Sequence, residues 1–392
     1  MRVRGARVER TVWCYFLFVG CSNFAATLSF LTIYLQHLRF SVAAVSAFLF
    51  VYQMCKFAFE IPTGFLSDRY GRKVVGQIGL VGMVIYYALL LWHHSLFCMF
   101  VALAVRGIAE SCVSGSLESL FVEVLPQDKL VRYNALERVC FYSANGASAL
   151  LGGALMGAGL FKLSVVVDLV AAAAAFVASA GIDERREKEG SGAKDELPTL
   201  SKAIASIESN ELLPSFLLMD FSQAFCFVGL EEFYTLVLQR SGFSPATSGA
   251  IIAVQLVVTS LFGLIVPVLV RGGNRTSLLL KLALVRLSMV ALFLLPGVPF
   301  LCAPLFYFLG DLLFTLFAPI KYELFQSACP PKYRATVISV QSQVTSLGAI
   351  AFFALSSLLS SVFDVQAVLL IALVMMSVLY VPALWRIVSH CE

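Results

Sequence analysis

Charged residues are scarce in this chain of 392 residues, since Asp, Glu, Lys and Arg together make up 13% of it. Soluble globular domains carry about 25% charged residues, so this composition excludes a soluble globular enzyme. Histidine occurs only four times, and none of the ten cysteines belongs to a C-x-x-C pair. We therefore expect no metal site and no cofactor. The sequence also lacks a G-x-x-x-x-G-K-[ST] loop, which excludes ATP hydrolysis by this chain.

The sequence consists largely of long apolar runs. Hydrophobic residues make up 59% of the chain, and the mean hydropathy is +0.88. A helix that spans a membrane needs about 20 mostly apolar residues. Twelve runs of this kind occur, at 11–36, 43–67, 74–93, 96–124, 132–157, 163–182, 212–238, 244–270, 276–296, 300–326, 334–361 and 365–388. The sequence therefore predicts an all-α membrane protein with twelve transmembrane helices.

Lysine and arginine are distributed unevenly between the two sets of loops that these runs create. One set contains nearly all of them, whereas the other contains only Arg39, Lys162 and Arg240. Because cytoplasmic loops carry the excess of Lys and Arg, both termini are predicted to be cytoplasmic. The polar segment 183–210 is then a cytoplasmic linker between two halves of six spans each, residues 1–182 and 211–392.

A short loop after the second run carries the most specific motif in the sequence. Its pattern is G-x-x-x-D-R-x-G-R-K, formed by Gly64, Asp68, Arg69, Gly71, Arg72 and Lys73. This loop resembles the one that joins the second and third helices of the major facilitator superfamily of secondary transporters. The preceding residues, Glu60-Ile61-Pro62-Thr63, are similar to those of a bacterial branch described as efflux transporters.

The resemblance implies both a fold and a gate. The fold consists of two pseudo-symmetric halves of six helices, related by an axis along the membrane normal. In the gate, Asp68 accepts hydrogen bonds from the start of the eleventh run, around Arg334, because the N-terminus of a helix favours an anion. We expect this contact to hold the outward-facing state and to be released in the inward-facing state. Gly64 and Gly71 are expected to allow close helix approach and a tight turn.

The fourth run contains an arginine far from either end. Arg106 lies roughly 15 Å from the start of the run, too deep for its side chain to reach water easily. Glu110 lies one turn further on the same face and is its expected partner, and Glu118 follows two turns later. The resemblance implies that Arg106 matches an arginine associated with proton coupling, although Glu110 replaces the family's glycine. The alternative is a structural ion pair that fixes the helix.

Other charges in the runs are expected to pair or to face a common pathway. Lys56 and Glu60 lie at i and i+4 in the second run and are expected to form a structural pair. In the superfamily, the first, fourth, seventh and tenth helices line the central cavity. The resemblance therefore implies a substrate and proton pathway, for which the candidates are Asn23, Glu60, Arg106, Glu110, Glu118, Asp220 and Asp311. Asp220 or Asp311 is the expected proton carrier.

These features predict a secondary active transporter that moves a small molecule across a bacterial inner membrane by alternating access. Proton-coupled efflux is favoured by the branch that residues 60–73 resemble. The fifth run gives only weak support for antiport, because it contains only Gly152 and Gly153 of the antiporter signature G-P-x-x-G-G. The alternative is an importer or facilitator of a specific, anionic metabolite that Arg106 would bind.

An intramembrane enzyme or a receptor is a further alternative from another class. It would need a catalytic constellation or a large soluble domain, and the sequence contains neither. The expected partners of the chain are its small-molecule substrate, protons and the lipid bilayer, with no nucleic acid. The chain is expected to be a monomer.

Overall fold

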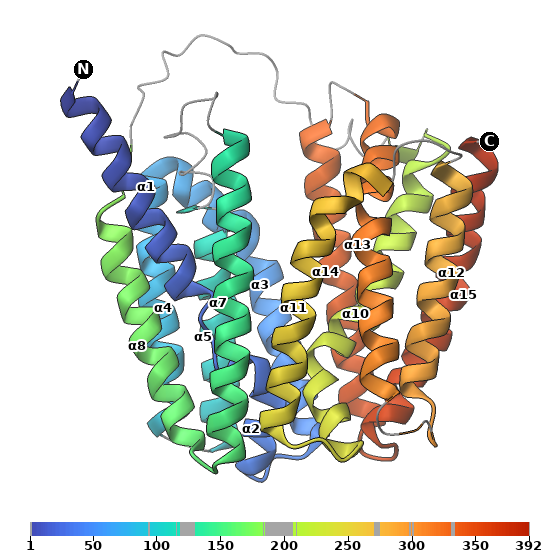
Figure 1. The fold of residues 1–392 in the computed structure, drawn as a ribbon, viewed down its shortest axis with the longest axis horizontal. Helices are drawn as coiled ribbons and strands as arrows, with labels where there is room; N and C mark the ends of the chain where they lie inside the picture. Colours follow the sequence, from blue (N-terminus) through green and yellow to red (C-terminus); the bar gives the residue numbers. More distant parts are fainter. Residues whose placement is uncertain are drawn as a thin grey trace. The chain divides into compact units, whose positions relative to one another are not determined.

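Helices form the whole architecture of the described part of the chain. A computed structural model describes residues 2–391 apart from 93–94, 115, 118–129, 183, 185–206, 209, 270–274, 298, 300–301 and 331–333. Among the described residues, 11 helices are long and apolar enough to cross a membrane. Together with the first run, which is interrupted, they account for the twelve predicted spans (Figure 1).

The contacts group the chain into two compact units. The first comprises residues 1–188 and 243–257, and the second comprises residues 189–242 and 258–392. The first unit contains α1 (Arg2–Ser22), η1 (Leu28–Phe30), α2 (Leu31–His37), α3 (Val42–Tyr70), α4 (Arg72–Trp92), α5 (Leu96–Ser114), α7 (Leu130–Gly157) and α8 (Phe161–Ala180). The second contains α10 (Leu213–Arg240), α12 (Arg275–Leu294), α13 (Ala303–Ala328), α14 (Arg334–Leu359) and α15 (Val365–Cys391). Helix α11 (Pro245–Leu269) contributes to both units.

Small residues allow the helices of each unit to approach closely. In the first unit, α5 packs between α3 and α4, and α8 packs against α1 and α4. A Cβ atom added at Gly79 of α4 would lie 2.7 Å from the carbonyl oxygen of Ala109 in α5. In the second unit, α10 packs against α13, α14 and α15. A Cβ atom added at Gly348 of α14 would collide with the carbonyl oxygen of Phe221 in α10. Membrane helices commonly use such small residues at their crossing points.

Several helix starts follow from local sequence signals. The Ser41 hydroxyl accepts a hydrogen bond from the Ala44 amide (3.2 Å) at the start of α3. Asp364 Oδ1 accepts one from the Ala367 amide (2.9 Å) at the start of α15. Both are N-cap contacts, which satisfy amides that have no partner within the helix.

The first predicted span, 11–36, is wrong as a single continuous helix. Helix α1 ends at Ser22, residues 23–27 are not helical, and the chain resumes as η1 and α2. Figure 1 shows α1 and α2 toward opposite ends of the first unit. Residues 23–30 contain neither Pro nor Gly, so no local signal predicts the interruption. A carboxylate on another helix accepts hydrogen bonds from this segment, as described below.

Parts of other predictions fall outside the described residues. The fourth span was expected to reach residue 124, but α5 ends at Ser114 and residues 118–129, including Glu118, are not described. Most of the predicted linker 183–210 is also not described, so the predicted halves stay a prediction. The side chains of Asp68 and Arg334 are likewise not described.

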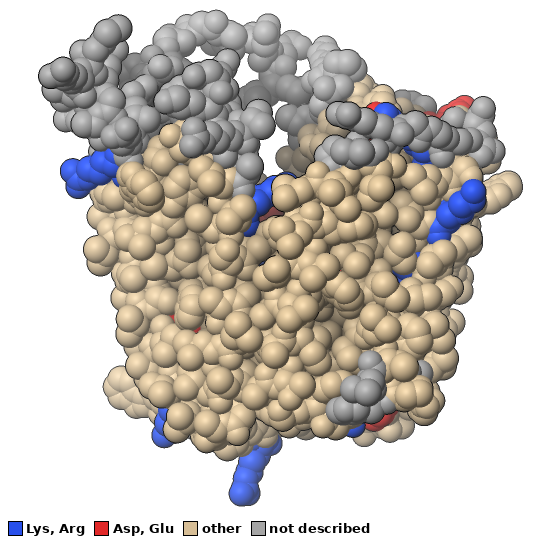
Figure 2. All heavy atoms as spheres, viewed as in Figure 1, with Lys and Arg blue, Asp and Glu red and all other residues tan. Residues whose placement is uncertain are grey.

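The exposed surface is that of a multi-pass membrane protein. On the face shown in Figure 2, coloured charged atoms gather near the upper and lower margins, and the band between them is almost entirely uncharged. Large apolar side chains are exposed along many helices, among them Ile78 of α4, Leu264 of α11 and Val374 of α15. Apolar surface of this extent is stable against lipid and not against water.

Candidate functional site

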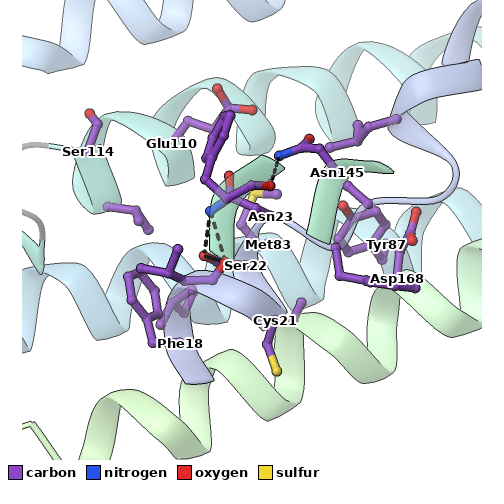
Figure 3. Close-up of a pocket in the computed structure, with 18 of the residues that line it drawn as sticks. Phe18, Cys21, Ser22, Asn23, Met83, Tyr87, Glu110, Ser114, Asn145 and Asp168 are labelled. Atoms are coloured by element: carbon purple, nitrogen blue, oxygen red, sulfur yellow. Dashed lines mark hydrogen bonds between the residues drawn. The ribbon is translucent and has the colours of Figure 1, made fainter. Parts of the chain in front are cut away.

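A cavity of about 360 Å³ lies inside the first unit. Its wall comes from the interrupted first span and from α3, α4, α5, α7 and α8. The charged and amide side chains on this wall are Asn23, Lys56, Glu110, Glu137, Asn145 and Asp168, and the aromatic ones are Tyr15, Phe18, Phe24, Tyr87 and Phe141. Figure 3 shows Asn23 in the midst of these residues, with Glu110 and Asn145 on neighbouring elements. Such a combination of aromatic and polar groups is typical of small-molecule sites.

A network of charged residues forms one side of the cavity. Arg106 Nε donates to Glu110 Oε1 (2.9 Å), which confirms the predicted contact between these two residues. The other oxygen of Glu110 accepts hydrogen bonds from Lys56 Nζ (3.1 Å) and from the Tyr52 hydroxyl (2.5 Å). Lys56 thus contacts a carboxylate across the interface of α3 and α5, whereas its predicted pair with Glu60 stays a prediction. Two cations and a hydroxyl thus stabilise one carboxylate inside the membrane.

The network depends on close contact between α3 and α5. A Cβ atom added at Gly107 would collide with the carbonyl oxygen of Tyr52 and would lie 3.0 Å from the amide nitrogen of Lys56. The Arg106 guanidinium lies over the Tyr52 ring, with 4.2 Å between its central carbon and the ring centroid. Glycine after Arg106 therefore brings the arginine, the tyrosine and Lys56 together.

The interruption of the first span is held by Asp168 of α8. Asp168 Oδ1 accepts a hydrogen bond from the Ala26 amide (2.6 Å), and Oδ2 accepts one from the Thr27 amide (2.7 Å). The sequence analysis missed Asp168 as a functional residue. The available signal was its position in an otherwise apolar run, since ionisable residues inside a membrane are functional candidates by default.

Two further contacts shape the cavity on the side of α1. Asn23 Nδ2 donates to the carbonyl oxygen of Val19 (2.9 Å), and so caps the end of α1. The Tyr15 hydroxyl donates to Glu137 Oε1 of α7 (2.7 Å). Of the predicted pathway residues, Asn23 and Glu110 line this cavity, and Arg106 lies directly behind Glu110.

The charged loop after α3 contacts the end of α8. Gly71 adopts a positive φ of 103°, which confirms the predicted turn. The Arg72 amide donates to Glu184 Oε1 (2.7 Å), and Lys73 Nζ donates to the carbonyl oxygen of Ala180 (2.7 Å). A Cβ atom at Gly64 would meet no described atom within 4 Å, so the close approach expected at this glycine is not observed. The predicted gating contact between Asp68 and the region of Arg334 stays a prediction.

The second unit contains its own carboxylate network. Asp220 of α10 is 4% exposed and forms an ion pair with Lys321 of α13. Its other oxygen accepts a hydrogen bond from Gln341 Nε2 of α14 (2.5 Å). Asp311 Oδ2 accepts one from the Thr259 hydroxyl (3.2 Å). Of the predicted pathway residues, Arg106 and Glu110 thus share a network in the first unit, while Asp220 and Asp311 each have partners within the second unit.

A buried arginine in the second unit lies between aromatic rings. The guanidinium carbon of Arg286 is 3.5 Å from the centroid of Phe227 and 4.1 Å from that of Phe314. The side chain is buried, and its Nε atom has no hydrogen-bond partner among the described residues. Cation–π contacts on both faces stabilise the charge in this position.

No metal centre is evident in the described part of the chain, because no three His, Cys, Asp or Glu side chains converge there as ligands. The polar groups of the first unit instead surround a space that suits a small organic molecule.

Comparison with known proteins identifies the family. The sequence model described as "Major Facilitator Superfamily" matches residues 12–352. The chain belongs to the major facilitator superfamily. It is therefore a multi-pass membrane transporter with the all-helical fold of that superfamily. No curated protein matches the sequence significantly.

Solved structures of this superfamily share the fold at low sequence identity. The nucleoside transporter NupG superposes with a TM-score of 0.78 at 14% identity, covering 97% of this chain and 98% of that chain. A bacterial homologue of the iron transporter ferroportin, in an inward-facing state, gives 0.69 at 15% identity, covering 97% and 98% of the two chains. The human organic anion transporter MFSD10 gives 0.61 at 18% identity, covering 97% and 99%. These neighbours transport different solutes, so the likeness shows the fold alone.

Proposed function

We propose that this chain is a secondary active transporter that exports a neutral or cationic small molecule across a bacterial inner membrane in exchange for protons. The observation that carries the proposal is the cavity in the first unit, where polar and aromatic groups surround a space within the membrane-spanning helices. Three carboxylates, Glu110, Glu137 and Asp168, line it, and the nearby cations are Lys56 and Arg106. This balance of charge favours a ligand without a negative charge.

Proton-driven transport in purified vesicles tests the proposal. The full-length protein is reconstituted in phosphatidylethanolamine and phosphatidylglycerol liposomes, and uptake of radiolabelled nucleosides, amines and carboxylates is measured. An antiporter accumulates its solute in the more acidic compartment, because protons leave as the solute enters. We expect accumulation of a neutral or cationic solute in vesicles with an acidic interior, and loss of it with a protonophore. Accumulation only with an alkaline interior would show symport and contradict exchange.

Import of an anionic metabolite is the second candidate function. Arg286 favours it, because a buried guanidinium with an unused Nε donor is suited to binding a carboxylate. The same vesicle experiment separates the candidates. Downhill exchange of a carboxylate, independent of the pH gradient, would support this facilitator and overturn proton-coupled export.

The charged loop provides a test of alternating access within the proposed function. We expect Asp68→Asn to preserve folding and membrane insertion but to reduce transport severely, because Asp68 is the anion of the proposed gate. Transport is measured in the vesicles described above, and folding is checked by gel filtration. Transport at the wild-type rate would remove Asp68 from the gate.

A further inference from the structure

The interruption of the first span is capped by a residue from a different helix. Asp168 is 1% exposed, and its two oxygens accept hydrogen bonds from the consecutive amides of Ala26 and Thr27. The Ser164 hydroxyl, one turn earlier on α8, accepts a hydrogen bond from the Thr27 hydroxyl (3.1 Å). Both residues lie just before η1, outside any helix, so Asp168 satisfies backbone donors that have no partner within a helix.

The contact explains how non-helical backbone persists inside the membrane. A backbone amide without a partner costs several kcal/mol in the hydrocarbon region, and irregular backbone occurs there only when protein buries it or a cavity adjoins it. An ionised carboxylate offers acceptors on both oxygens, which matches the two amides. Without Asp168, the chain would have to satisfy these amides by continuing the helix or by admitting water.

The held segment is also a wall of the cavity. Asn23, Phe24, Ala25, Leu28 and Ser29 line it, while Ala26 and Thr27 face α7 and α8 and are fully buried. On the side of α7, a Cβ atom added at Gly152 would collide with the carbonyl oxygen of Ala26. The segment is therefore fixed from behind by two helices and presents side chains to the cavity in front.

We propose that Asp168 is a positioning residue of the transport site, which fixes the wall formed by Asn23 to Ser29 in the form that contacts the ligand. This inference rests on the proposed function for the role of the cavity. Asp168 borders the cavity but is only 1% exposed, so it acts through the backbone that it holds, and the first-span residues in front of it contact the ligand.

Hydrogen–deuterium exchange of the full-length protein in lipid nanodiscs tests the contact without a known ligand. In Asp168→Ala, we expect the amides of residues 24–31 to exchange at least about tenfold faster, because local opening no longer breaks the two hydrogen bonds to the carboxylate. Sodium formate supplies a free carboxylate of the right size and should restore slow exchange, whereas sodium chloride should not. Asp364→Asn is the matched control, because it also alters an aspartate that caps a helix but lies outside the cavity.

The outcomes separate positioning from a role in folding alone. Faster exchange confined to residues 24–31 and reversed by formate supports the inference. Wild-type exchange in this segment overturns it, as does faster exchange throughout the first unit that formate does not reverse. If Asp168→Ala yields no folded protein, Asp168→Asn replaces it. That variant keeps one acceptor oxygen, so it should give an intermediate rate, and a wild-type rate would again overturn the inference.

A transport readout links the contact to function. For a solute that the vesicle panel identifies, Asp168→Ala should raise KM by at least about tenfold with a smaller change in kcat, and formate should lower KM again. An unchanged KM would overturn the positioning role. A panel with no transported solute would count against the proposed function, whereas the exchange experiment would still decide whether Asp168 holds the segment.

Discussion

The first and seventh predicted spans lie in different units of the molecule, and they are built differently. Helix α10, the seventh span, runs without interruption from Leu213 to Arg240. The first span consists of α1 and α2, separated by five non-helical residues and η1. One predicted span of this chain is therefore a continuous helix, whereas another contains non-helical backbone. The interrupted span lines the cavity, and its non-helical segment presents side chains to that cavity.

The carboxylates of Asp168 and Asp220, which contact these two spans, also bind different kinds of partner. Asp168 lies on a neighbouring helix and accepts hydrogen bonds from backbone amides. Asp220 lies on the seventh span itself and binds the side chains of Lys321 and Gln341 on two other helices. The first arrangement holds a bend in the backbone, whereas the second ties three continuous helices together. We therefore expect the first unit to be more adaptable around its cavity and the second to be more rigid around α10.

The largest effect is expected for Glu110→Gln in the first unit. This change leaves Arg106 and Lys56 without their common anion, which should lower the free energy of unfolding by about 3–5 kcal/mol and abolish transport. Thermal unfolding in detergent micelles and vesicle transport measure the two effects. An unchanged melting temperature would show that the network is not a stabilising element of the first unit.

A smaller effect is expected for Asp220→Asn in the second unit. Only Lys321 loses its counter-ion, and the new amide can still bond to Gln341, so we expect a loss of about 1–3 kcal/mol. If Asp220 is also the proton carrier, accumulation driven by the pH gradient should disappear while downhill exchange persists. Asp311→Asn is the matched variant, because Asp311 is the other expected carrier in this unit. Full gradient-driven transport by both variants would place the carrier elsewhere.

Two glycines test the difference between the interrupted and the continuous span directly. Gly152 packs against Ala26 of the first span, and Gly348 packs against Phe221 of the seventh span. Gly348→Ala should lower stability by about 1–3 kcal/mol, because a continuous helix cannot shift locally. Gly152→Ala should cost less stability but raise KM, because the non-helical segment can move away from α7 at the expense of its contact with Asp168. Equal losses of stability would contradict the comparison.

The sequence predicts much of this fold because apolar run length and the distribution of Lys and Arg are strong constraints in a membrane. It also predicts the pair of Arg106 and Glu110, since i and i+4 residues share one face of a helix. The contact of Lys56 with Glu110 and the interruption at residues 23–27 could not be predicted. Each depends on a carboxylate from a helix distant in sequence, and neither leaves a signal in its own run.

The smallest effect concerns the second carboxylate that caps a helix of the first unit, Glu184 at the start of α4. Gly71 precedes this contact with a φ of 103° and a ψ of 141°, a conformation that is essentially reserved for glycine. Gly71→Ala should therefore cost about 1–2 kcal/mol, and its Cβ atom would lie 2.9 Å from Glu184 Oε2 and displace the cap.

Gly64→Ala is the matched control, because Gly64 lies inside α3 with no described atom within 4 Å of the added Cβ. Alanine forms helices better than glycine by about 1 kcal/mol, so this variant should unfold at the same temperature as the wild type or higher. The two substitutions in one loop motif should thus shift the melting temperature in different directions. A similar decrease in both would show that the strain at Gly71 and its contact with Glu184 do not determine the stability of this turn.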